Sequence, residues 1–132
     1  MALARIEVVK GRSPREKRAL LDAVHEALIA ALKVPRGDPA LRIVEHEPAC
    51  FELPTAPGAV SDRYTLIEIT MFSGRSIEAK RELYAQIVER LGELGVPATD
   101  ITIVVLEAPR ENWGVHGGRP ASEVELGFSV EV

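Results

Sequence analysis

Two arginines, Arg12 and Arg75, each stand within a Gly-Arg-Ser tripeptide, and the two tripeptides lie 63 residues apart. In both copies the serine is placed to cap a following helix, so the arginine comes directly before a helix N-terminus. Free backbone amides and the helix dipole favour an anion there, and a planar guanidinium can hold a carboxylate through two parallel hydrogen bonds. We therefore expect Arg75 to bind a small carboxylate. The alternative is an exposed arginine that pairs with a nearby acid such as Glu78.

The sequence around these arginines is duplicated. Residues 10–28 and 73–91 share eight identities in 19 aligned positions, and apolar residues recur at helical spacing in both copies. This pattern predicts helices near 14–33 and 77–94, the first beginning with a capping box between Ser13 and Glu16. The same shift aligns alternating apolar residues at 4–8 and 67–71, which predicts a strand before each helix.

A second strand is predicted after each helix, near 40–46 and 101–107. The latter is so continuously apolar that we expect it to be central in the sheet and covered on both faces. Two βαβ units result, and neither can bury both faces of its strands alone. We therefore expect one α/β domain over residues 1–132, with repeat 1 at about 1–47, a proline-rich linker at about 48–62 and repeat 2 at about 63–132. Weak alternation over 124–132 predicts a short extra strand in the chain's own sheet or a neighbouring subunit's sheet.

The composition excludes several classes of function. A formal net charge of −4 gives no global basic field, so we expect neither nucleic acid nor a membrane surface as a partner. Charges interrupt the first ten residues, which argues against a signal peptide and for a cytoplasmic protein. The three histidines lie far apart and show no ligand spacing, so we expect no metal and no other cofactor.

Two segments resemble a known family. The run from Arg5 to Ser13 (RIEVVKGRS), followed by the helix opening Glu16-Lys-Arg, resembles the start of 4-oxalocrotonate tautomerase. The run from Asn112 to Ser122 (NWGVHGGRPAS) resembles the segment that closes that short enzyme. The likeness covers nearly the whole chain and is to fused, two-repeat members of the tautomerase superfamily, nearest malonate semialdehyde decarboxylase. It implies a four-stranded mixed sheet backed by two helices and a homotrimer.

The resemblance also implies a catalytic amine at the start of the chain. In the family this is an N-terminal proline, exposed when the initiator methionine is removed, whereas this sequence has Ala2. A freed Ala2 would still offer a primary amine with a reference pKa of roughly 7.7–8.0, close enough to neutrality for acid–base work. While Met1 is present the Ala2 nitrogen is an amide, and Ala2 is then only a small residue at the start of a strand.

Further site residues follow from the same resemblance. Asp38 aligns with an acid that assists the amine or a water, although Gly37-Asp-Pro is also good turn chemistry. Trp113 takes the place of an aromatic wall that excludes water, or serves as plain hydrophobic cover. Arg75 matches the arginine that binds the substrate carboxylate, and Arg12 matches the functional arginine of the short tautomerase.

Together these residues predict a protein that binds a small 3-oxo or unsaturated carboxylate. Because the catalytic proline is replaced, we expect tautomerase, decarboxylase or hydratase chemistry to be weak or absent. The alternative is a non-catalytic trimeric binding protein, or degenerate paralogue, that keeps the anion site without turnover. The amine at position 2 distinguishes the two.

Overall fold

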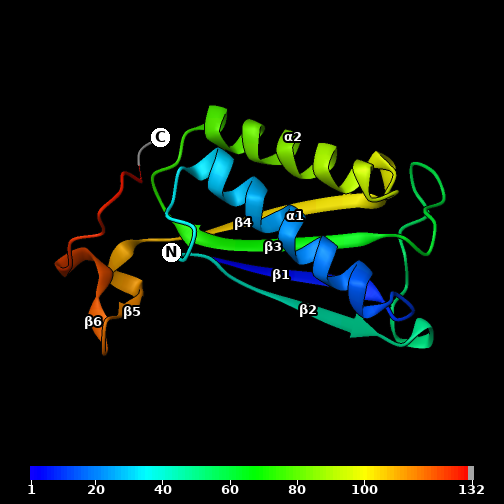
Figure 1. Ribbon diagram of the computed structural model, residues 1–132, viewed down its shortest axis with the longest axis horizontal. Helices are drawn as coiled ribbons and strands as arrows, with labels where there is room; N and C mark the ends of the chain where they lie inside the picture. Colours follow the sequence, from blue (N-terminus) through cyan, green and yellow to red (C-terminus); the bar gives the residue numbers. More distant parts are fainter. Residues whose placement is uncertain (131–132) are drawn as a thin grey trace.

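A computed structural model describes residues 1–130 of the chain (Figure 1). It contains two βαβ units: β1 (Ala2–Val9), α1 (Pro14–Leu32) and β2 (Ala40–His46), then β3 (Thr65–Phe72), α2 (Ile77–Glu93) and β4 (Ile101–Ala108). The strands form one sheet in the order β2-β1-β3-β4, parallel within each unit and antiparallel where β1 meets β3. Both helices cover the same face of the sheet. The predicted four-stranded mixed sheet backed by two helices is confirmed.

The helices begin where the serines predicted. Ser13 accepts from the backbone N–H of Glu16, and the Glu16 side chain accepts from the Ser13 N–H, which completes the capping box. Ser76 accepts from the backbone N–H of Ala79 in the same way. Both helices end one residue before the predicted limits, at Leu32 and Glu93, and Lys33, the residue after the first helix, takes a left-handed conformation.

Strand register decides which loops share an end of the sheet. In the antiparallel central pair, Ala2 lies opposite Met71 and Val8 lies opposite Thr65. The start of β1 therefore lies beside the end of β3, and the end of β4 runs alongside it in parallel. The chain start, the loop holding Arg75 and the segment after β4 consequently gather at one end, at the left in Figure 1.

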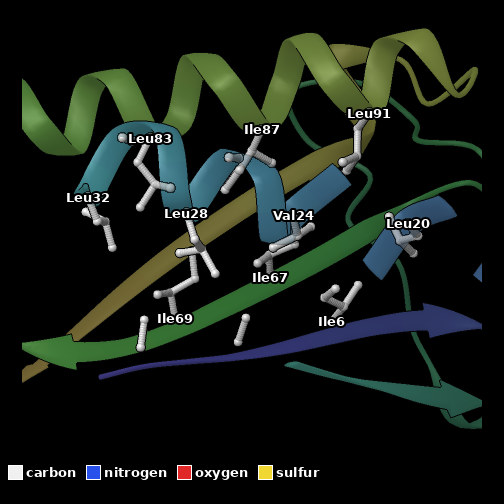
Figure 2. Close-up of a cluster of buried hydrophobic side chains, with 14 of the residues drawn as sticks. Ile6, Leu20, Val24, Leu28, Leu32, Ile67, Ile69, Leu83, Ile87 and Leu91 are labelled. Carbon is white, nitrogen blue, oxygen red and sulfur yellow. The ribbon is translucent and has the colours of Figure 1, made fainter. Parts of the chain in front are cut away.

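The hydrophobic core lies between the sheet and the two helices. Alternate residues of β1 and β3 are buried against the helices, as expected for strands with one covered face. Figure 2 shows the helix side chains that reach toward this face, among them Val24, Leu28, Leu83 and Ile87. Because both helices contact the same central strands, the two repeats share one core.

The prediction that the 101–107 strand is central was wrong. β4 lies at the edge of the sheet, and on the face away from the helices Val104 and Leu106 are 39% and 49% exposed. Its apolar run fills both faces of the strand, but only one face has helices to pack against. The central strands are β1 and β3, the first strand of each repeat.

The segments outside the repeats are mostly irregular. The linker contains one short 3₁₀ turn, Pro48–Cys50, and no helix or strand over 51–64. After β4 a small hairpin forms from β5 (Gly114–Val115) and β6 (Arg119–Pro120). The extra strand expected over 124–132 does not appear in residues 124–130, and residues 131–132 lie outside the described part of the chain. Phe128 instead packs against the core.

Candidate active site

The chain's amino group lies in an ion pair at the start of β1. The Met1 amine is 3.3 Å from Oδ2 of Asp38, which sits two residues before β2. Burial lowers the pKa of the amine below its ordinary value, the Asp38 charge opposes this, and the Arg75 charge lowers the pKa further. A lowered pKa leaves a larger fraction of the amine unprotonated near neutral pH, and this fraction is available as a base.

Arg75 is buried beside this pair. Only 7% of the residue is exposed, and its Nη1 donates a 2.6 Å hydrogen bond to the backbone carbonyl of Leu32, at the end of α1. Burial lowers the pKa of Arg75, while the charge of Asp38 acts in the opposite direction. The alternative of an exposed Arg75–Glu78 pair does not fit this geometry. Leu32 accepts from one of the two N–H groups of Nη1, and no other described residue accepts a hydrogen bond from Nε or Nη2, so these two nitrogens can donate to a carboxylate.

The loop that holds Arg75 is tightly constrained. Gly74 has a φ of +123°, a conformation that side chains rarely adopt, and a Cβ placed there would lie 3.3 Å from the carbonyl oxygen of Val130. The segment near the described C-terminus therefore lies directly against this loop. No local sequence pattern predicts this contact.

Trp113 lies at the same end of the sheet. Its indole N–H donates a 3.1 Å hydrogen bond to the Ala108 carbonyl, and its ring meets that of Phe72 edge-on with centroids 5.0 Å apart. The Ala108 carbonyl also accepts from the backbone N–H of Ser73. Trp113 is thus fixed to the ends of β3 and β4, and its role as a ligand-facing wall stays a prediction.

The structure brings three of the predicted positions together: the chain start at Met1–Ala2, Asp38 and Arg75. Ala2 is 1% exposed and, with Met1 attached, its nitrogen is a peptide amide. Arg12 lies at the opposite end of the sheet, where its Nη2 donates to the Thr65 hydroxyl at the start of β3. Its substrate-binding role likewise stays a prediction.

Residues 1–130 contain neither a metal-binding cluster nor a membrane-spanning helix. No group of three or more His, Cys, Asp or Glu side chains in this range is arranged to hold a metal ion. Neither helix in the described range is long and apolar enough to cross a membrane.

Comparison with known proteins identifies the family. Residues 38–116 match the model of a family described as tautomerase enzyme, and residues 3–49 match a second family model with the same description. Probable tautomerase YrdN of Bacillus subtilis (strain 168) is 28% identical over 116 residues, covering 86% of this chain and 89% of that relative.

Solved structures show the same likeness over most of the chain. The crystal structure of FG41 malonate semialdehyde decarboxylase inhibited by 3-bromopropiolate is 31% identical, with a TM-score of 0.81 and coverage of 91% of this chain and 92% of the other. A fused 4-OT described as a wild-type symmetric trimer, 24% identical, has a TM-score of 0.79, covers 91% of this chain and 96% of its own, and supports the fold alone.

Proposed function

Since the chain belongs to the tautomerase superfamily, we propose that it binds a small 3-oxo or unsaturated carboxylate between its amino terminus, Asp38 and Arg75. The observation that carries this proposal is the cluster of a half-buried amine, a half-buried carboxylate and the buried guanidinium of Arg75. The relative inhibited by 3-bromopropiolate, itself a small unsaturated carboxylate, supports the ligand class.

Each group of the cluster has a role in this proposal. The free donors of Arg75 hold the ligand carboxylate, and the amine, with its lowered pKa, accepts a proton from the carbon between the two carbonyl groups. The electron pair moves to the 3-oxo oxygen, and the protonated amine is stabilised by Asp38 until it returns the proton. In decarboxylation the bond to the carboxylate breaks instead, and carbon dioxide leaves with the electrons passing toward the 3-oxo group.

We propose that this chemistry is weak or absent because Ala2 replaces proline. While Met1 is attached, the only amine is that of Met1 and the Ala2 nitrogen cannot act as a base. After removal of Met1 the amine is primary. Ala2 also favours the alternative function, a binding protein without turnover. That function requires Arg75 but not the amine.

We further propose that the 132 residues form one domain that assembles as a homotrimer. The shared core of the two repeats supports the single domain. The sheet face away from the helices supports the assembly, because it leaves Val104 and Leu106 exposed on an edge strand.

The test of the ligand proposal is calorimetry with malonate on protein whose N-terminus is defined by intact mass. Arg75→Ala should weaken malonate binding by roughly 1.5–3 kcal/mol, because it removes a charged hydrogen bond at a buried site. Arg81→Ala, which removes an exposed arginine from α2, the helix that follows the Arg75 loop, is the matched control and should change binding by less than about 1 kcal/mol. Equal affinity of the parent and Arg75→Ala would remove Arg75 from the site.

A further inference from the structure

A second cluster of arginines lies at the opposite end of the sheet from the amine. It borders a cavity of about 140 Å³ between the start of α1 and the end of α2, lined by Arg12, Arg15, Glu16, Ala19, Leu20, Arg63, Leu94 and Val96. A neighbouring hollow of about 380 Å³ shares Arg12, Glu16 and Arg63 with it. These shared side chains form the partition between the two spaces.

The guanidiniums of this cluster are incompletely paired. Nη2 of Arg12 donates to the Arg63 carbonyl at 2.8 Å and to the Thr65 hydroxyl at 3.2 Å, while Nη1 of Arg12 and Nε of Arg63 are buried without a hydrogen-bond acceptor among the described residues. Buried donors of this kind are costly when unpaired. Burial, and then the nearby charge of Arg63, lower the pKa of Arg12, while the charges of Glu16 and Asp62 act in the opposite direction. Nη1 of Arg63 also lies 3.3 Å from Oε2 of Glu16, so this arginine is partly paired. An anion bound between Arg12 and Arg63 would accept hydrogen bonds from the unpaired donors and would offset the repulsion between the two positive charges.

The rest of the smaller cavity is apolar. Leu20 and Val96 are buried core residues, and Ala19 and Leu94 continue the wall toward solvent. The site thus has a hydrocarbon side and a charged side, on which three arginines outnumber the single carboxylate of Glu16. We propose that this cavity is a second binding site, which takes a short aliphatic monocarboxylate with its carboxylate between Arg12 and Arg63 and its chain against the apolar wall.

The internal repeat explains why this site would bind without turnover. The 63-residue shift that relates Arg12 to Arg75 also relates Thr65 to Ala2. Arg63 donates to the carbonyl of Leu94 at the end of α2, much as Arg75 donates to that of Leu32 at the end of α1. Thr65 lies within the chain, so its nitrogen is an amide and no amine can form here. The proposal is independent of chemistry at the amino terminus.

Calorimetry with butyrate in the Arg75→Ala protein tests this site alone. We expect one butyrate per chain, and adding Arg12→Ala should weaken binding at least about 10-fold. Acetate should bind more weakly than butyrate, by about 4-fold for each methylene that the apolar wall buries. Arg18→Ala, which removes an exposed arginine of α1 that pairs with Asp22, is the matched control and should leave binding unchanged.

A second variant keeps the test independent of folding. Ala19→Leu leaves both arginines in place but fills the cavity, so it should weaken butyrate binding while circular dichroism and the melting temperature stay near those of the parent. If Arg75→Ala protein binds no butyrate, or binds it equally with and without Ala19→Leu, the second site is overturned. Failure of the proposed function gives a different pattern, in which Arg75→Ala leaves malonate binding intact.

Discussion

Replacing Ala2 with proline, in protein from which Met1 has been removed, should create or raise decarboxylase or hydratase activity. Ala2 is the first residue of β1, a strand position that tolerates proline, and its side chain is buried beside the chain start. Asp38 and Arg75 act electrostatically on the Met1 amine, one residue before this position. The substitution supplies the secondary amine that the family resemblance implies.

The size of the gain in activity depends on the distance between the new amine and the Asp38 carboxylate. General acid–base participation is typically worth about 10²- to 10⁴-fold in rate. The 3.3 Å contact belongs to the Met1 nitrogen, and removal of Met1 moves the amine one residue along the chain to position 2, about 3.8 Å between Cα atoms. Because misplacement by as little as 1 Å can cost about 100-fold, we expect a gain near the lower limit unless the loop holding Asp38 follows the amine.

The assay compares the parent and Ala2→Pro with malonate semialdehyde, 2-oxo acids and acetylenic acids, after intact mass has confirmed that Met1 is absent. Ala2→Pro protein that retains Met1 is the control, because its proline nitrogen is an amide and should give no activity. If the unblocked proline variant is as inert as its parent, the site has diverged beyond the amine. The binding-protein alternative would then replace the enzymatic one.

Three other substitutions and one pH effect are expected to report on the same structure. Asp38→Asn should lower the pKa of the terminal amine further, measured by NMR titration, because the Asp38 charge now opposes the lowering by burial; an unchanged or raised pKa would contradict the ion pair. Since the folded amine already has a lowered pKa, the folded state binds fewer protons there, so this group makes stability rise with pH up to its unfolded pKa of roughly 7.7–8.0. Denaturant unfolding between pH 6 and 8 should show that slope weaken when the amine is acetylated. Leu106→Glu should shift the mass seen by light scattering from a trimer toward a monomer, and a parent that is already monomeric would refute the assembly. Gly74→Ala should reduce the free energy of unfolding by about 1–3 kcal/mol, because of its φ of +123° and the nearby C-terminal segment; a melting temperature equal to the parent's would show that the loop adapts.

Most of the fold could be predicted from the sequence because the signals for each strand and helix occur in both copies of the repeat. Ser13 and Ser76 set the helix starts, and alternating apolar residues set the covered face of the two central strands. The position of β4 was mispredicted because an apolar run does not reveal how many neighbours a strand has. Residues such as Leu106 look like core residues in sequence, yet the structure leaves them on an open face.

The site was only partly predictable for a similar reason. Arg75 and Asp38 could be nominated from their local settings, but the contact of Arg75 with a carbonyl 43 residues away has no local signature. Arg63 was missed altogether, because it belongs to the linker side of β3 and its importance depends on Leu94 and Glu16, which only the fold brings near.

In each repeat an arginine contacts the other repeat, so the two halves of the chain depend on each other. Arg75 holds the end of α1, Arg12 holds the start of β3, and β1 pairs with β3 across the join. Cutting the exposed linker near Gly58 would therefore yield two pieces that each lack partners held by the other, namely the β1–β3 pairing and the two arginine contacts. Their association would become bimolecular and dilution would dissociate them, whereas the intact linker keeps each half at a high effective concentration of the other.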